Sequence, residues 1–379
     1  MINSKLKIAV FVANLYGGGA ERMMLNLAKG FAKMGIKTQI VLGIAEGPYL
    51  NEIPSSIDVI DLNSNKVLYS VNKLRKYLID QRPDVLISTL SRVNIAAILA
   101  KSFSRVNTKL ILREANTFSV YLGSNKGLWD KMIDYMIKKL YKKGDKIVAV
   151  SEGVAKDLKK TLPGLEDKIT VIYNPVIDEE VFKKANEPIN NEWLNDKVIP
   201  VIVAVGRISE QKDFSTLLKA FNLVLQKIDV RLLILGKYNK DDKEYLKLIN
   251  LIDEFDIRDR IKFEGFVDNP FAYLSRASLF VLSSKWEGLP GALIQALACG
   301  CPVVSTNCPS GPDEILKYGK FGSLVDVGDV LGLSNKIIET IKRGNSNKDE
   351  LVERSLEFSV SEATNKYLKI VETVISSKG

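Results

Sequence analysis

Residues 283–314 read SSKWEGLPGALIQALACGCPVVSTNCPSGPDE. A β-rich run at residues 279–282 leads into a turn that holds one acid, Glu287, and Gly288-Leu289-Pro290 then opens a helix whose body is almost wholly apolar. Such a helix N-terminus has unpaired N–H groups and a positive dipole end, and proline there loses no helical hydrogen bond. The stretch therefore predicts an anion site, with phosphate as the leading candidate.

The one polar side chain in the body of that helix is Gln295. A polar group on a buried helix must find a hydrogen-bond partner or it lowers stability, and a bound ligand can be that partner. The acid in the preceding turn also has an ordinary interpretation, because such residues often cap helices or lie in solvated loops. Other motifs of the chain are needed to tell whether Glu287 and Gln295 bind a ligand or have ordinary structural roles.

The layout from Glu287 to Gln295 resembles the E-x7-E motif of retaining family 4 glycosyltransferases. Their GT-B fold has two Rossmann-like, doubly wound α/β domains that face a central cleft. Glu287 matches the first acid, which in that family lies against the donor sugar. Gln295 stands where the second acid usually holds the nucleotide ribose, so the motif here is E-x7-Q. Residues 299–316, CGCPVVSTNCPSGPDEIL, also resemble the turn, strand and Gly/Pro-rich loop that follow this helix in the family.

Composition excludes several kinds of chemistry. A length of 379 residues predicts two domains, and 46% hydrophobic residues are enough for two cores. Histidine is absent, which excludes a Ser-His-Asp triad, a Cys-His pair, a His-ligated zinc and an imidazole base. The odd number of cysteines, Cys299, Cys301 and Cys308, indicates reduced thiols in a cytosolic protein, and as a metal site they lack a fourth ligand.

Charge is unevenly distributed along the chain. Residues 1–180 hold 27 Lys and Arg against 18 Asp and Glu, whereas the remainder holds 27 of each. A basic half can face nucleic acid, an anionic membrane or a polyanionic substrate, and composition does not choose among them. No apolar run approaches a membrane-spanning length, and MINSKLKIAVFVAN is typical of a first strand without a signal-peptide cleavage pattern. We therefore expect a cytosolic protein.

The first elements are a strand, a glycine loop and a helix. Residues 7–13 form an apolar run typical of a buried parallel strand, and Gly17-Gly18-Gly19 precedes a helix over residues 20–34. The loop is not G-x-G-x-x-G, because position 22 is Arg22. Three glycines let the backbone approach an anion, although a tight turn would use them equally well. The run GGAER resembles the family's N-domain loop, which approaches the donor phosphate and the acceptor.

Further strands with intervening helices are predicted at residues 38–44, 59–62, 84–89, 109–115, 146–151 and 169–175. Such alternation predicts a parallel sheet covered on both faces, with ligands beyond the carboxyl ends of its strands. Arg113, Glu114 and Asn116 stand at one such end, as candidates for the acceptor side of a site or as residues of a solvated loop. Family members often place a histidine in this region, and this chain has none.

A lysine-rich helix is predicted within residues 127–146, GLWDKMIDYMIKKLYKKGDK. Its apolar residues at helical spacing are Trp129, Met132, Ile133, Met136, Ile137 and Leu140, and its lysines are Lys131, Lys138, Lys139, Lys142, Lys143 and Lys146. Such a helix can lie on an anionic membrane surface, or it can pack on the sheet with its lysines in water. Both interpretations hold if the apolar residues of the helix pack into the core while its lysines contact lipid headgroups.

The second half repeats this architecture without obvious sequence identity. Residues 177–199 are interpreted as the crossing between domains. The elements predicted after them are strands at 201–205, 232–235 and 261–263 and helices at 214–227 and 241–255. The predicted domains are residues 1–180 and 181–358, and residues 359–379 contain a helix that in GT-B proteins commonly crosses back to the first domain.

The first loop of the second domain, residues 206–213, reads GRISEQKD. It resembles the family's Gly-Arg…Lys element, which implies that Arg207 and Lys212 grip the nucleotide diphosphate. Two fixed cations in a closed cleft stabilise charge on a diphosphate leaving group without a metal. Two later strand ends, Gly236-Lys237 and Gly265-Phe266-Val267, border the nucleobase in the family, although each can also be a simple turn.

The resemblance spans nearly the whole chain and implies a retaining, metal-independent glycosyltransferase with no cofactor beyond its co-substrate. The donor would be a UDP-hexose or UDP-N-acetylhexosamine. The acceptor would be a glycan on a lipid carrier, as in surface polysaccharide or lipooligosaccharide assembly, with the N-terminal domain on the cytoplasmic face of the inner membrane. The expected donor-binding residues are Gly17, Gly18, Gly19, Gly206, Arg207, Lys212, Gly236, Lys237, Phe266, Val267, Glu287, Gly288, Leu289, Pro290 and Gln295. Glu287, Arg207 and Lys212 would be catalytic.

Two other functions fit the same architecture. A UDP-N-acetylglucosamine 2-epimerase would need acid and base residues, commonly including histidine, which this chain lacks. The other is a non-catalytic protein that binds a nucleotide sugar. Nucleic acid is disfavoured as a partner, because the excess charge is not interleaved with a stacking aromatic platform.

Overall fold

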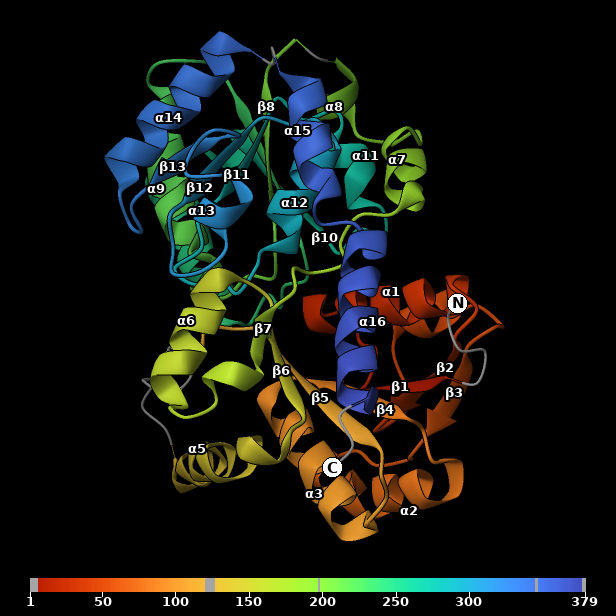
Figure 1. Ribbon diagram of the computed structural model, residues 1–379. Helices are drawn as coiled ribbons and strands as arrows, with labels where there is room; N and C mark the ends of the chain where they lie inside the picture. The colour runs from red at the N-terminus through yellow and green to blue at the C-terminus, as the bar shows by residue number, and fades with distance from the viewer. Residues whose placement is uncertain (1–5, 120–126, 197, 345–346, 377–379) are drawn as a thin grey trace. The chain divides into compact units, whose positions relative to one another are not determined.

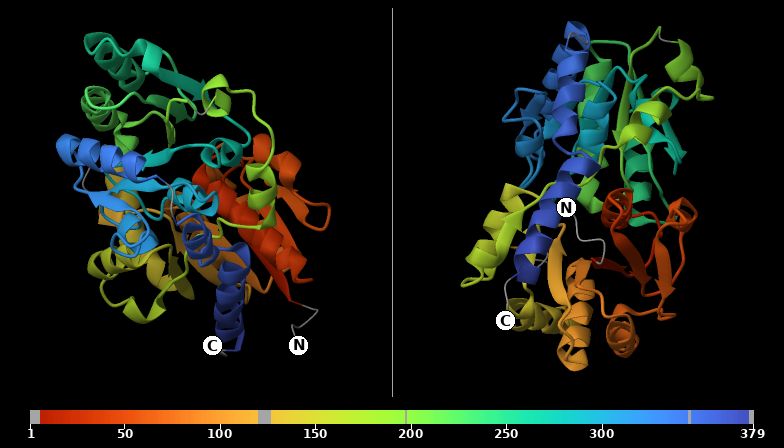
Figure 2. Two further views of the ribbon diagram at one scale, coloured as in Figure 1. Left: turned by 90° about the horizontal axis from the view of Figure 1, so that it is seen from above. Right: turned by 45° about the vertical axis from the view of Figure 1, so that its right-hand side comes forward.

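The computed structural model describes residues 6–119, 127–196, 198–344 and 347–376. The chain forms two compact units, unit 1 (Met1–Val176 with Val360–Gly379) and unit 2 (Ile177–Ser359). Each unit contains one parallel sheet flanked by helices, as Figure 1 and the two further views in Figure 2 show. The predicted α/β class with two doubly wound domains is therefore confirmed.

Unit 1 has a seven-stranded sheet in the order β3-β2-β1-β4-β5-β6-β7. Its strands are β1 (Lys7–Val12), β2 (Lys37–Leu42), β3 (Asp58–Asp61), β4 (Val85–Thr89), β5 (Lys109–Glu114), β6 (Lys146–Ala149) and β7 (Ile169–Val171). Its α-helices are α1 (Gly19–Lys33), α2 (Val71–Gln81), α3 (Ser91–Ser104), α5 (Leu128–Leu140), α6 (Glu152–Thr161) and α16 (Val360–Ser376). Its 3-10 turns are η1 (Pro48–Glu52), η2 (Val67–Ser70), η3 (Tyr141–Lys143) and η4 (Glu166–Lys168). Each strand lies within the apolar run predicted for it or begins one residue earlier.

The strand order of unit 1 reverses between β1 and β4. From β1 the chain continues to β2 and β3 on one side, and it then returns to β4 on the other side. Loops that leave in opposite directions open a crevice at the carboxyl edge of such a sheet, which is where ligands bind in open α/β folds. Gly17-Gly18-Gly19 follows β1, and Leu90 follows β4 with φ of 72°, an uncommon backbone for a bulky residue. Backbone strain of this kind gathers at functional edges.

Helix α16 completes the core of unit 1 against α1. The rings of Phe31 in α1 and Tyr367 in α16 meet edge to face, with centroids 6.5 Å apart. A Cβ added at Gly30 would lie 2.2 Å from Thr364 Oγ1, so only glycine permits this close approach. Figure 1 shows α16, in blue, beside α1, in red. The last helix is therefore part of the core that contains β1.

Unit 2 has a six-stranded sheet in the order β10-β9-β8-β11-β12-β13, which reverses between β8 and β11. Its strands are β8 (Val201–Val205), β9 (Arg231–Leu235), β10 (Ile261–Gly265), β11 (Leu279–Leu282), β12 (Val303–Thr306) and β13 (Ser323–Val325). Its helices are α7 (Glu179–Ala185), α8 (Glu192–Asp196), α9 (Phe214–Leu225), α10 (Lys243–Glu254), α11 (Pro270–Leu274), α12 (Gly291–Ala298), α13 (Pro312–Ile315), α14 (Val330–Arg343) and α15 (Lys348–Leu356), with 3-10 turns η5 (Glu210–Lys212) and η6 (Arg258–Arg260).

The interpretation of residues 177–199 as a crossing is wrong, because α7 and α8 belong to unit 2. Asp178 caps α7 by accepting from two backbone N–H groups, and Ser275 Oγ donates to Ala185 O at 2.6 Å. The buried apolar residues of this segment are few and lie among many charged ones, so the sequence pattern did not reveal them. With these boundaries the charge asymmetry is larger than expected: unit 1 holds 30 basic and 17 acidic residues, and unit 2 holds 24 and 28.

Candidate functional site

Two loops of unit 2 meet where its strand order reverses. Residues 206–213 follow β8, and residues 283–290 follow β11. Ser283 Oγ donates to Lys212 O at 2.8 Å, Lys285 N donates to Gln211 O at 2.8 Å, and Gln211 Nε2 donates to Trp286 O at 3.0 Å. The two loops are thus hydrogen-bonded into one platform at the carboxyl edge of the sheet, where ligands are expected.

The platform holds an ion pair between two of the predicted catalytic residues. Lys212 Nζ lies 2.6 Å from Glu287 Oε1, and Ser284 Oγ donates to the same oxygen at 2.8 Å. Glu287 is buried, with 7% of its surface exposed. A Cβ added at Gly206 would lie 2.9 Å from Lys212 Cε, so the predicted glycine leaves room for the lysine stem. The structure therefore brings Gly206, Lys212 and Glu287 together.

Arg207 stands at the exposed rim of the same platform. Its side chain is exposed, whereas the next residue, Ile208, is buried and anchors the loop in the core. Arginine offers a rigid fork of five donors that suits phosphate oxygens. The loop thus holds one exposed cation, Arg207, and one that is paired and partly buried, Lys212.

Helix α12 begins at Gly291, one residue later than predicted, because Pro290 is the N-cap with an extended ψ of 105°. The Gly/Pro-rich loop that follows β12 packs closely against the turn before α12. Gly311 has φ of 99°, and a Cβ there would lie 2.7 Å from Pro290 Cδ and 3.0 Å from Gly288 O. Leu289 is buried beneath the turn with 5% of its surface exposed.

Gln295 lies on the side of α12 that is not fully packed. The buried residues of this helix are Leu293, Ile294, Ala296, Leu297 and Ala298. Gln295 is half-buried and shares its face with Gly291 and Ala292, which are also half-buried. The amide can therefore meet a ligand without breaking the core.

The predicted nucleobase residues lie at the ends of β9 and β10. Gly236 has φ of 148°, and a Cβ there would lie 2.0 Å from Gly206 O, so this turn touches the first loop of unit 2. Lys237 Nζ lies 4.9 Å from the centroid of the Phe266 ring, and that ring is 43% exposed. Val267 is half-buried. A cation thus follows β9, which pairs with β8, and an exposed aromatic side chain follows β10, which pairs with β9.

Cys308 lies near the ion pair between Lys212 and Glu287, although its residue type and position did not predict a site there. The pKa of its thiol is raised to about 12, chiefly by burial and also by the Glu287 carboxylate, while Lys212 opposes the shift. Cys299, Cys301 and Cys308 are all buried and not joined by disulfides. The signal for Cys308 was its place in the Gly/Pro-rich loop after β12.

The glycine loop of unit 1 is braced by the segment around η1. Arg22 pairs with Glu52, and its guanidinium lies 3.6 Å from the centroid of the Tyr49 ring. Tyr49 in turn donates from its hydroxyl to Gly17 O at 3.2 Å, and Leu15 N donates to Glu46 O at 2.9 Å. The sequence identified Arg22 only as a departure from a motif, but the residue holds the loop in place.

Arg113 and Glu114 are not in a solvated loop, because both are buried at the end of β5, with 2% and 3% of their surfaces exposed. Arg113 donates to Thr89 Oγ1 at 2.7 Å and to Asn174. Its pKa is lowered by burial, while Tyr367, Glu114 and Glu21 act to raise it. Asn116, by contrast, is exposed.

Glu114 belongs to a buried polar network. Its Oε1 accepts from Asn94 Nδ2 at 2.8 Å and from the hydroxyl of Tyr141, and burial raises the pKa of the carboxyl. Asn94 in turn accepts from Ser88 at 2.7 Å. These contacts fix Glu114 at the same sheet edge as the glycine loop.

Helix α5 packs part of its predicted stripe into unit 1. Ile133 and Ile137 are fully buried, but Met132 is 39% exposed and Tyr135 is 62% exposed. The exposed lysines here are Lys131, Lys138, Lys139, Lys142 and Lys143, whereas Lys146 is half-buried. The Trp129 side chain lies outside the described part of the structure. The stripe is thus partly core, and a lysine face with two exposed apolar side chains remains at the surface.

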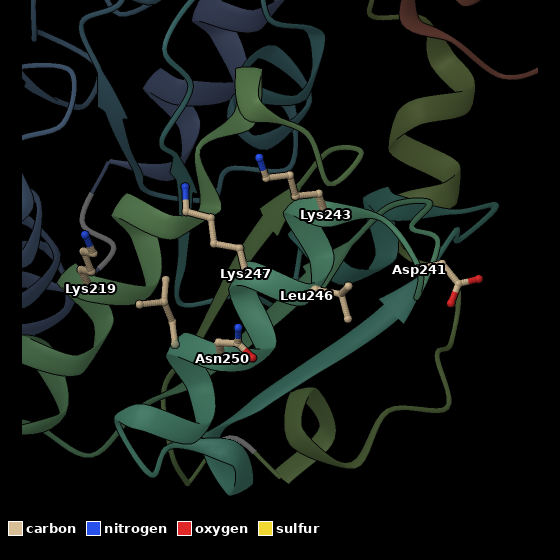
Figure 3. Close-up of a pocket in the computed structure, with 7 residues that line it drawn as sticks. Lys219, Asp241, Lys243, Leu246, Lys247 and Asn250 are labelled. Carbon is tan, nitrogen blue, oxygen red and sulfur yellow. The ribbon is translucent and has the colours of Figure 1, made fainter.

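A separate surface pocket lies between α9 and α10 of unit 2 (Figure 3). It is lined by Lys219, Asp241, Lys243, Leu246, Lys247, Asn250 and Leu251. None of these residues belongs to the platform above. Within the described residues, no helix is long and apolar enough to cross a membrane, and no cluster of acidic or cysteine side chains has the makings of a metal site.

Both halves of the chain match models of glycosyltransferase families. Residues 17–180 match the model described as Glycosyltransferase Family 4, and residues 186–355 match the model described as Glycosyl transferases group 1. An uncharacterized glycosyltransferase of Methanocaldococcus jannaschii is 30% identical over 279 residues, which cover 68% of this chain and 67% of that protein.

A second relative has a named reaction. The N-acetylgalactosamine-N,N'-diacetylbacillosaminyl-diphospho-undecaprenol 4-alpha-N-acetylgalactosaminyltransferase of Campylobacter jejuni is 29% identical over 333 residues, covering 85% of this chain and 86% of that protein.

Solved structures agree on the fold. A glycosyltransferase from Rickettsia africae superposes with a TM-score of 0.80 at 20% identity, covering 99% of this chain and 100% of that one. Anabaena HepE in complex with UDP and glucose superposes with a TM-score of 0.79 at 17% identity, covering 97% and 100%.

Proposed function

The chain belongs to the family 4 glycosyltransferases with the GT-B fold, and on this premise we propose that it moves a hexose or N-acetylhexosamine from a UDP-sugar to a lipid-linked glycan. Glycosyltransferase activity follows from the family. The donor, the acceptor, the retention of configuration and the independence from metal are our proposal.

The contact between Lys212 and Glu287 is the observation that carries the proposal. It joins a cation suited to the donor diphosphate and a carboxylate suited to sugar hydroxyls at the reversal of the unit 2 sheet. Arg207, exposed in the same loop, would hold the diphosphate together with Lys212. Gln295 would meet the ribose, and Phe266 with Lys237 would border the uracil.

The chemistry would need no imidazole base, which this chain cannot supply. The bond between the sugar C1 and the β-phosphate oxygen breaks, and UDP leaves with the electron pair. The incoming hydroxyl oxygen bonds to C1 on the same face, and its proton passes to the departing phosphate. Arg207 and Lys212 would stabilise the charge that develops on the diphosphate.

A lipid-linked acceptor is supported by the surface of unit 1 and by a relative. Unit 1 holds 13 more basic than acidic residues, and α5 presents lysines beside the exposed Tyr135 and Met132. Aromatic and basic side chains together suit the headgroup region of an anionic membrane. The Campylobacter relative is named for a diphospho-undecaprenol acceptor.

A panel of UDP-sugars tests the proposal with the full-length protein. We expect UDP to bind and one UDP-sugar to be slowly hydrolysed, or transferred when an acceptor is present. Formation of an epimer would indicate a 2-epimerase, and binding without turnover would indicate a non-catalytic protein. Either result would overturn the proposal.

A further inference from the structure

Ser284 is a buried serine beside the ion pair of the platform. It is 0% exposed, and its Oγ donates a hydrogen bond to Glu287 Oε1 at 2.8 Å. The same carboxylate oxygen lies 2.6 Å from Lys212 Nζ. A neutral hydroxyl and a cation therefore hold one oxygen of Glu287 together.

The two donors come from different loops and are anchored differently. Ser284 lies in the same loop as Glu287, after β11, and its backbone O accepts from Thr306 Oγ1 at 2.7 Å. Thr306 ends the neighbouring strand β12 and is fully buried. Lys212 belongs to the loop after β8. The Ser284 hydroxyl is thus held beside Glu287 independently of the lysine side chain.

The Lys212 ammonium, by contrast, ends a long side chain that is partly accessible. This side chain is 18% exposed, against 9% for that of Glu287. Ser283 Oγ fixes the backbone of Lys212 by donating to its O at 2.8 Å, and this contact does not fix the side-chain torsions. A lysine carries a point charge on a flexible stem of four carbons. Lys212 Nζ can therefore turn towards a bound anion while its loop stays in place.

Such a turn takes the cation away from Glu287. A carboxylate that is 7% exposed is destabilised by the loss of its cation, and more so where no hydrogen-bond donor remains. Ser284 supplies a donor that stays on Oε1. The destabilisation is therefore smaller with Ser284 present, and the carboxylate keeps its orientation.

We propose that Ser284 is a positioning residue, which holds the Glu287 carboxylate towards the donor sugar while Lys212 turns to the donor diphosphate. The inference rests on the proposed function, because it requires a diphosphate at this platform. No covalent bond changes in this step: Lys212 exchanges one anionic partner for another, and Glu287 keeps the hydrogen bond from Ser284. Without that hydroxyl, Glu287 competes more strongly with the diphosphate for Lys212.

Calorimetric titration of UDP into the full-length parent, Ser284→Ala, Glu287→Gln and the double variant tests the proposal. We expect Ser284→Ala to bind UDP about three- to tenfold more weakly, because Glu287 then retains Lys212. Glu287→Gln should bind UDP at least as tightly as the parent, because a neutral amide does not compete for the cation. Once Glu287 is replaced by Gln, adding Ser284→Ala should change the affinity by less than about twofold, since the serine then has no carboxylate to hold.

A matched control removes another buried hydroxyl of unit 2. Ser334 is 2% exposed, and its Oγ donates to Leu331 O within α14 at 2.8 Å. Ser334→Ala should bind UDP like the parent. Thermal unfolding checks that every variant is folded.

Dependence of the loss on Glu287 distinguishes positioning from general support of the platform. An equal loss of UDP affinity with Glu287 and with Gln at position 287, or no loss in either, would overturn the proposal, since Ser284 would then act without Glu287. We also expect Ser284→Ala to lower kcat about tenfold for the UDP-sugar that the parent uses, because the carboxylate is no longer fixed, and an unchanged kcat would equally overturn it.

Failure of the proposed function gives a different result, because it is seen in the parent. A parent that binds UDP but turns over no UDP-sugar would overturn the proposed function alone, and the titrations would still decide the role of Ser284. A parent that binds no UDP would overturn both.

Discussion

Lys212 Nζ lies 2.6 Å from Glu287 Oε1, although the family resemblance gives these side chains different parts of the donor, the diphosphate and the sugar. The ion pair therefore places the two expected subsites directly beside each other. On the proposed assignment, an incoming diphosphate shares Lys212 with Glu287 or draws Lys212 away from it. The contact holds the lysine stem against Gly206 until then.

Removal of either platform cation, Arg207 or Lys212, should lower activity to a similar extent. The two removals should differ in their effect on stability. We expect Arg207→Ala and Lys212→Ala each to lower kcat/KM about a hundredfold, because each removes charge stabilisation at the leaving group. Arg207 is exposed, so its loss should leave the unfolding temperature unchanged. Lys212→Ala removes the cation beside a carboxylate that is 7% exposed, leaves Ser284 as a donor to it, and should cost about 1–3 kcal/mol in urea unfolding. Transfer at the parental rate by either variant would refute the diphosphate assignment.

Substitution of Gln295 should change the affinity for the nucleotide and leave folding unaffected. Its half-buried position on α12 means that Gln295→Leu should fold and bind UDP more weakly. Gln295→Glu should bind UDP as tightly or more tightly, since a carboxylate forms stronger bonds with ribose hydroxyls. Calorimetric titration with UDP checks both variants. If the leucine variant binds as well as the parent, Gln295 does not face the nucleotide.

We predict weak, salt-sensitive binding of the protein to anionic vesicles through α5 and η3. Each lysine near such a surface contributes about 1 kcal/mol, and salt screens the effect. Replacing Lys138, Lys139, Lys142 and Lys143 by Gln should abolish binding in vesicle sedimentation. The matched control replaces four exposed lysines of unit 2, Lys219, Lys240, Lys243 and Lys247, by Gln and should bind normally. Equal binding to neutral vesicles, or an equal loss in the control, would contradict a membrane role for α5.

Because the cysteines are buried, we predict that the protein loses stability at alkaline pH. Burial raises the pKa of Cys299 and Cys308 to about 12, from an ordinary value of 9.0. Between pH 9 and 12 the native state keeps thiol protons that the unfolded chain has lost. The contribution of these thiols to the free energy of unfolding therefore falls as pH rises from about 9 to 12. We expect Ellman's reagent at pH 8 to leave the native thiols unmodified for minutes and to modify all three in guanidinium. Immediate modification of the native protein would contradict their burial.

The sequence predicted the strands well because buried parallel strands are continuous apolar runs bounded by turns. Strand β13 was missed, since three residues at Ser323–Val325 give too short a pattern. The burial of Arg113 was also missed, because arginine is rarely buried and nothing local shows its partners from two other strand ends. The pairing of Lys212 with Glu287 spans 75 residues, and only the resemblance suggested that they belong to one site.

Helix α16 also bears on the order in which the two units can fold during synthesis. Unit 2 is one continuous segment, residues 177–359, and its core is complete when that segment has been made. Unit 1 receives Tyr367, Val371 and Val374 from the last helix, so the α1 face of its core stays uncovered while the whole of unit 2 is translated. At roughly 5–20 residues per second this wait lasts about 10–40 s. The first half of the chain to leave the ribosome is therefore the last to reach its native state, and an exposed apolar surface on it during that interval is a natural target for chaperones.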